Sequence, residues 1–129
     1  MAMKMFVNLP VSDLDRSTAF FEKLGFQFFG AAEGMASVII SEDTQVMLLT
    51  EPTFTSYISK DVADAAKSTE VVLVLGVETP AQVDELVGKA LDAGATPAGV
   101  PKDGGGVYQR GFADLDGHHW EALCLVQPG

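Results

Sequence analysis

The sequence is poor in cysteine and in long apolar runs. Cys124 is the only cysteine among 129 residues, so no disulfide can form within the chain. Its apolar neighbours favour a small buried side chain there. No stretch approaches the roughly 20 apolar residues that a membrane-spanning helix needs. Residues 1–5 lead directly into a strand pattern without the apolar core of a signal peptide, so we expect a cytoplasmic protein.

Basic residues are also scarce. Eight Lys and Arg residues stand against eighteen Asp and Glu residues, which gives a net charge of −10. An acidic surface repels phosphate backbones and anionic lipid headgroups, so neither nucleic acid nor a membrane is an expected partner. The length fits one compact domain, and 47% apolar residues can supply its core.

The first half of the chain shows a strand, a helix and three further strands. Residues 5–9 form a strand pattern that Pro10 limits, and Asp13 is a good N-cap for a helix that ends at Gly25. The three β-rich runs that follow are residues 26–31, 35–40 and 45–50. Apolar residues at helical spacing between residues 52 and 68 predict a short connecting helix.

The second half repeats this plan. A Val-rich strand pattern at residues 70–77 precedes Thr79 and Gln82, which form a capping box for a helix that Gly94 ends. The three further strands are predicted around residues 96–100, 106–113 and 119–126. The glycine-rich residues 102–106 between two of them lack the spacing of a phosphate-binding loop and favour a plain hairpin loop.

This internal duplication predicts an α+β protein of a single domain, residues 1–129, with two βαβββ modules. The first module covers about residues 1–51, the connecting segment about 52–68 and the second module about 69–129.

Three segments carry a resemblance to a known family. They are residues 8–17, residues 20–26 and the segment from Asp114 to Glu121. They resemble the glyoxalase/bleomycin resistance/dioxygenase (vicinal oxygen chelate) superfamily, and within it the branch of lactoylglutathione-lyase-like proteins. The resemblance implies that the two modules form a curved eight-stranded mixed sheet around a cavity for a small molecule. It also implies a homodimer.

The resemblance implies a metal site that this sequence does not complete. Metal-dependent members place one ligand on the first and last strand of each module. Carried over one by one, these positions are Phe6, Leu48, Val72 and Glu121. A divalent metal needs roughly three or four donors, and three of these side chains have none, so we expect no metal and no other cofactor. The alternative is a displaced site made of His119, Glu121 and Glu70.

Glu121 is the predicted catalytic or acid–base residue, because a lone carboxylate on an apolar strand is costly unless it is paired or used. A structural ion pair with Arg110 is the alternative. The predicted ligand-binding residues are Phe6, Asn8, Leu48, Val72, Tyr108, Arg110 and His119. Several rest on strand alternation, which places Asn8 beside Phe6 and His119 beside Glu121. The alternative for His119, which we favour over a metal ligand, is a solvated or hydrogen-bonded residue near the cavity rim.

Three functions follow from this pattern. The leading one is a protein of the glyoxalase/bleomycin-resistance type that binds a small molecule in its cavity without the usual metal. The second is an enzyme, either a lactoylglutathione-lyase-like lyase or isomerase or a dioxygenase, with a rebuilt metal site. The third is a dimerisation or partner-binding protein with a vestigial cavity.

Overall fold

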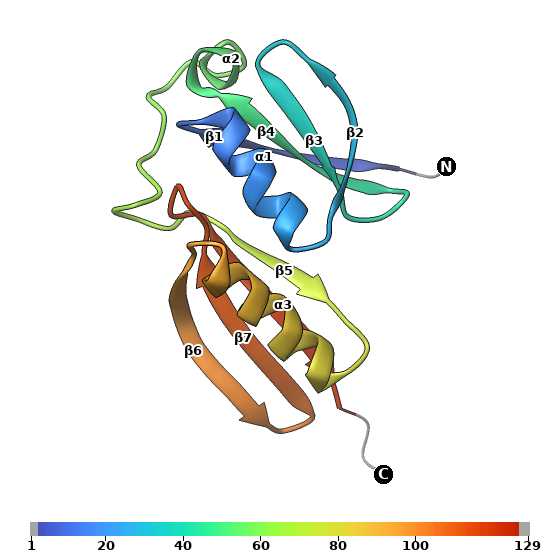
Figure 1. Cartoon of the computed structure of the whole chain (residues 1–129). Helices are drawn as coiled ribbons and strands as arrows, with labels where there is room; N and C mark the ends of the chain where they lie inside the picture. The colour runs from blue at the N-terminus through green and yellow to red at the C-terminus, as the bar shows by residue number, and fades with distance from the viewer. Residues whose placement is uncertain (1–2, 127–129) are drawn as a thin grey trace. The chain divides into compact units, whose positions relative to one another are not determined.

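The computed structural model describes residues 3–126, and the chain divides into two compact units, Met1–Ala63 and Asp64–Gly129. Each unit contains a four-stranded mixed sheet with a helix packed on it (Figure 1). The prediction of an α+β protein with two βαβββ modules is therefore confirmed, with its eight strands in two sheets. The predicted module ends at residues 1–2 and 127–129 lie outside the described residues.

The first unit has its strands in the order β1-β4-β3-β2. Its elements are β1 (Met5–Val11), α1 (Leu14–Lys23), β2 (Gln27–Ala32), β3 (Met35–Ile39), β4 (Thr44–Thr50) and α2 (Glu51–Thr55). Strand β1 runs parallel to β4, and the other neighbours are antiparallel. Helix α1 begins because the Asp13 side chain accepts a hydrogen bond from the Arg16 amide at 3.0 Å. It buries Phe20 and Phe21 in the core of this unit.

The second unit repeats the arrangement, with the order β5-β8-β7-β6. Its elements are β5 (Val72–Gly76), α3 (Pro80–Asp92), β6 (Thr96–Gly104), β7 (Val107–Ala113) and β8 (His119–Leu125). The predicted capping box of Thr79 and Gln82 is present at the start of α3. This helix packs on β7 and β8, where the rings of Phe112 and Trp120 stack at 6.4 Å with no exposed surface. Strand β8 is central in this sheet, between β5 and β7.

Three local predictions differ from the structure. Pro10 lies within β1, which tolerates it because this strand is at the edge of its sheet and needs no donor on the outer side. The connecting helix is only α2, and residues 56–71 contain turns and bends, because five residues of helix bury no side chain that would extend it. Residues 102–104 of the predicted loop pair with β7, so the hairpin turn is shorter.

Among the described residues, no helix combines the length and the apolar character that crossing a membrane requires.

Candidate functional site

Strand β8 separates core residues from site residues by simple alternation. Trp120, Ala122 and Cys124 are buried beneath α3, and the residues that alternate with them, His119, Glu121 and Leu123, lie on the opposite face of the sheet. Among the described residues, no helix of this unit packs on that face (Figure 1). The alternation predicted for this strand is present, and it brings a histidine and a carboxylate side by side.

Glu121 is buried and fully engaged. Its side chain is 8% exposed, Oε2 pairs with Nε2 of His119, and Oε1 accepts a hydrogen bond from Nε2 of Gln109 at 3.1 Å. A buried carboxylate needs such partners, since its desolvation would otherwise cost several kcal/mol. The three side chains form one cluster, which we call the Glu121 cluster, with Glu121 at its centre.

Two glycines make room for the Glu121 carboxylate. Gly111 lies directly opposite Glu121 on β7, and a Cβ there would collide with the carboxylate and lie 2.7 Å from the carbonyl oxygen of Ala98. Gly99 lies where the pairing of β6 with β7 shifts register, with a φ of 76°, and its Cβ would lie 2.6 Å from Oε2 of Glu121. Any side chain at either position would displace the carboxylate.

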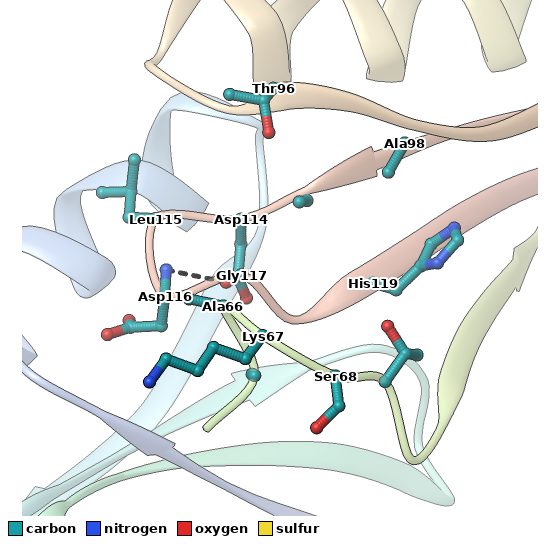
Figure 2. Close-up of a pocket in the computed structure, with 13 residues that line it drawn as sticks. Ala66, Lys67, Ser68, Thr96, Ala98, Asp114, Leu115, Asp116, Gly117 and His119 are labelled. Atoms are coloured by element: carbon teal, nitrogen blue, oxygen red, sulfur yellow. Dashed lines mark hydrogen bonds between the residues drawn. The ribbon is translucent and has the colours of Figure 1, made fainter. Parts of the chain in front are cut away.

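A pocket of about 460 Å³ lies on the same face of the second sheet. Its lining comes from the segment before β5, from β6 and β7, from the turn between β7 and β8, and from β8 (Figure 2). The lining residues are Ala65, Ala66, Lys67, Ser68, Thr69, Thr96, Ala98, Ala113, Asp114, Leu115, Asp116, Gly117 and His119. His119 is the member of the Glu121 cluster that reaches this pocket.

One wall of the pocket is the turn between β7 and β8, which Asp114 organises. Its Oδ1 accepts hydrogen bonds from the amides of Asp116 and His118, and its Oδ2 accepts one from Nε1 of Trp120, each at 3.0 Å. Burial raises the pKa of the Asp114 carboxyl above its ordinary value, although His118 and the three hydrogen bonds act in the other direction. The Asp114 carboxylate therefore stabilises the turn and has few hydrogen-bonding positions left for a ligand.

A close backbone contact holds the other wall in place. Gly117, with a φ of 91°, lies so near the preceding segment that a Cβ would be 2.8 Å from the carbonyl oxygen of Ala65 and 2.9 Å from Cα of Ala66. The segment before β5 thus rests on the turn between β7 and β8 and closes one side of the pocket (Figure 2).

Two predicted ligand-binding residues of β7 lie on the wrong face. Tyr108 and Arg110 point toward α3, where the tyrosine hydroxyl and the guanidinium both donate to Oδ1 of Asp84, at 2.6 and 2.8 Å. The hydrogen bond from Tyr108 lowers the pKa of Asp84 most, and the hydrogen bond from Arg110 lowers it next. The hydrogen bond between Tyr108 and Asp84 also raises the pKa of Tyr108. The alternative ion pair between Arg110 and Glu121 is wrong, because the sheet lies between them.

Comparison with known proteins places the fold. Residues 4–41 match the family described as "Bleomycin resistance protein-like N-terminal". A hypothetical protein from S. aureus is 33% identical, with a TM-score of 0.82 over 96% of this chain and 95% of that one. A glyoxalase/bleomycin resistance protein/dioxygenase family enzyme from Burkholderia phytofirmans is 19% identical, with a TM-score of 0.78 over 97% and 100%.

The chain has the fold of the glyoxalase/bleomycin resistance/dioxygenase superfamily, and its first 41 residues include the match to the bleomycin-resistance-like family. A third structure of this fold is TnmS3, an antibiotic-binding protein from Streptomyces, which is 20% identical with a TM-score of 0.69 over 97% of each chain. A comparison with curated proteins gives no match.

In the first unit, the two positions implied for the superfamily's metal ligands lie on different faces of the sheet. Phe6 and Asn8 lie on the face of β1 opposite to the buried Leu9, and Phe6 is 56% exposed. Leu48 does not share that face, because it pairs with Leu9 and is completely buried. Met47 is the residue opposite Asn8, so the prediction of Leu48 as a lining residue was wrong by one position of the strand.

In the second unit, Val72 lies opposite His119 and is 46% exposed, on the face that carries Glu121. Among residues 3–126, no three His, Cys, Asp or Glu side chains gather closely enough to hold a metal ion. Glu70 of the displaced site is exposed and precedes β5, so it does not join His119 and Glu121. Two paired side chains do not make the donor set that such a metal requires.

Three residues of the site were missed by the sequence reasoning, namely Gln109, Gly99 and Gly111. A signal existed for Gly111, because a glycine inside a strand pattern often marks a close approach of another group. Pairing β7 with β8 across the Asp116-Gly117 turn would have placed it opposite Glu121. Gly99 had no such signal, because its position near Glu121 depends on a register shift in β6 that the sequence does not indicate.

Proposed function

We propose that this protein binds a small molecule in the pocket of its second module without the usual metal of its superfamily. The pocket carries the proposal: about 460 Å³ falls within the range of ligand sites in proteins, roughly 300–1,000 Å³. Small apolar, hydroxyl-bearing and charged side chains surround it, and the Glu121 cluster lies at its edge through His119. The antibiotic-binding TnmS3 of the same fold supports a ligand-binding role.

A screen of small organic molecules by thermal denaturation tests this proposal. Thr96 is an exposed residue of the lining, so Thr96→Trp should fill the pocket while the core stays intact. Thr96→Val, which removes only the hydroxyl, is the matched control. We expect compounds that raise the melting temperature of the wild type and of Thr96→Val but not of Thr96→Trp. Stabilisation that is equal in all three proteins, or none in any, would contradict the proposal.

The alternative is an enzyme, either a lyase or isomerase of the lactoylglutathione-lyase-like kind or a dioxygenase. The observation in its favour is the buried carboxylate–imidazole pair, a common arrangement for moving a proton. Elemental analysis of protein purified without added metal or chelator separates the two functions. A stoichiometric divalent metal would favour the enzyme and overturn the metal-free proposal.

We also propose a cytoplasmic homodimer whose partner is a small molecule, with no nucleic-acid partner. The net charge of −10 supports the last point. A vestigial cavity filled by its own side chains is disfavoured by the pocket in the second unit.

A further inference from the structure

Both oxygens of the Glu121 carboxylate are already occupied by the protein. His119 holds Oε2 and Gln109 holds Oε1, while the positions of Gly99 and Gly111 lie against the carboxylate. Only 8% of the Glu121 side chain is exposed. A ligand could reach this carboxylate only by displacing one of its two hydrogen-bond partners, which leaves Glu121 a poor direct contact.

His119 has the complementary geometry. Its Nε2 is bound to Glu121, its side chain is 17% exposed, and it lines the pocket. Within residues 3–126, no side-chain nitrogen or oxygen is buried without a partner, and no protein group bonds to Nδ1 of His119. This nitrogen therefore remains open to solvent. Figure 2 shows the ring rising from β8 at the edge of the pocket, toward the strand that carries Ala98.

We propose that His119 is the residue that contacts the ligand, and that Glu121 is its positioning residue. This inference rests on the proposed function. An ionised carboxylate only accepts hydrogen bonds, so Glu121 holds the imidazole in the form that carries its hydrogen on Nε2. In its neutral form the ring then offers Nδ1 as an acceptor. The ligand is therefore a small molecule with a hydrogen-bond donor in its head group, either an alcohol or a protonated amine.

The rest of the lining fits such a head group. Ser68 and Thr69 bring hydroxyls that can both donate and accept, so they suit an alcohol and an amine alike. Lys67 and Asp116 add one charge of each sign. The chain as a whole carries a net charge of −10, which favours a neutral or cationic ligand over an anion. A carboxylate head group would face the lone pair of Nδ1 without a hydrogen between them.

Three probes that share a phenyl ring and differ in their head group distinguish these possibilities: benzyl alcohol, benzylamine and benzoate. Each is titrated into the full-length ¹⁵N-labelled protein in alkaline buffer, and the amide shifts of residues 96, 113 and 119 are followed. We expect the alcohol or the amine to bind at least about fivefold more tightly than benzoate, which is the effect of roughly one hydrogen bond. The comparison of alcohol with amine shows which of the two donors is preferred.

Glu121→Gln provides the decisive variant. Gln109 would still donate to the oxygen of the new amide, which turns the amide nitrogen toward His119. Nε2 must then accept, so the hydrogen moves to Nδ1 and the ring offers a donor to the pocket. Long-range ¹H–¹⁵N spectra of the imidazole report this exchange directly. We expect the preference among the probes to shift toward benzoate, and His119→Phe to abolish any preference.

The outcomes separate the two proposals. If no probe moves the pocket amides of the wild type, the proposed function fails together with this inference. If the probes bind without regard to head group, or the wild-type imidazole carries its hydrogen on Nδ1, only this inference is overturned. A probe preference that stays the same after the hydrogen has moved in Glu121→Gln would also overturn it. Folding of each variant is checked by its amide spectrum.

Discussion

Asp114 and Glu121 are two buried carboxylates of one unit with different surroundings. Asp114 accepts from two amides of its own turn and from the indole of Trp120, which are groups of a fixed framework. Glu121 instead binds two side chains, and one of them, His119, reaches the pocket. Partners of the first kind define a structural residue, and partners of the second kind can transmit an effect to a ligand.

Asp114 provides a prediction at the scale of one residue. In Asp114→Asn one donor would lose its acceptor, so the free energy of unfolding should fall by about 1–3 kcal/mol. Burial raises the folded-state pKa of Asp114 above its ordinary value of 3.8. A group of this kind stabilises the fold most below its unfolded pKa, and the contribution is lost as pH rises through the folded-state pKa.

The free energy of unfolding of the wild type should therefore exceed that of Asp114→Asn by more near pH 4 than near pH 7. Urea denaturation of both proteins at the two pH values measures it. An advantage that grows toward neutral pH would show that the three hydrogen bonds, rather than burial, dominate the pKa of this carboxyl.

Strand β7 has one face for the helix and one for the site. Tyr108 and Arg110 reach Asp84 of α3, whereas Gln109 and Gly111 meet Glu121. Successive residues of this strand therefore contribute to packing on one side and to the site on the other.

This division predicts opposite effects of neighbouring substitutions. Tyr108→Phe removes the shorter of the two bonds to Asp84, so we expect a lower melting temperature and unchanged binding of benzyl alcohol. Gln109→Leu removes a bond to Glu121, so it should weaken the binding of this probe. Calorimetry and the amide titration give the two quantities. Weaker probe binding by Tyr108→Phe would place Tyr108 back in the ligand site.

Most of the helices and strands could be predicted from the sequence, but less of the arrangement of the site residues. Alternation along β8 placed His119 and Glu121 together because it depends only on neighbouring residues. Leu48 and Arg110 were misplaced because a face is known only when the register with the next strand is known, and one position reverses it. The Asp116-Gly117 turn indicates the register of β7 with β8, but the sequence contains no such local signal for β1 with β4 or for β6 with β7, so the contact of Gly99 with Glu121 was missed.

At the scale of the whole molecule, apolar side chains remain exposed on the helix-free face of each sheet. Phe6 is 56% exposed in the first unit, and Val72 and Val74 are 46% and 48% exposed in the second. Exposed apolar residues of this kind often mark a contact with another subunit.

We therefore expect a homodimer, as the resemblance to the superfamily also implies. Light scattering on the purified chain should give twice the monomer mass of 13.7 kDa at micromolar concentration. Val74→Lys, which places a charge on the exposed surface of β5, should shift the equilibrium toward monomer. A stable monomer of the wild type would contradict the expectation.

The contact of Gly117 with residues 65 and 66 also affects how substitutions could alter the pocket during evolution. Every residue that lines this pocket lies between residues 65 and 119, so one half of the sequence supplies the lining of the proposed ligand site. Within the second half, a mutation that gives residue 117 a side chain would push the 65–66 segment away and reshape the pocket at one step.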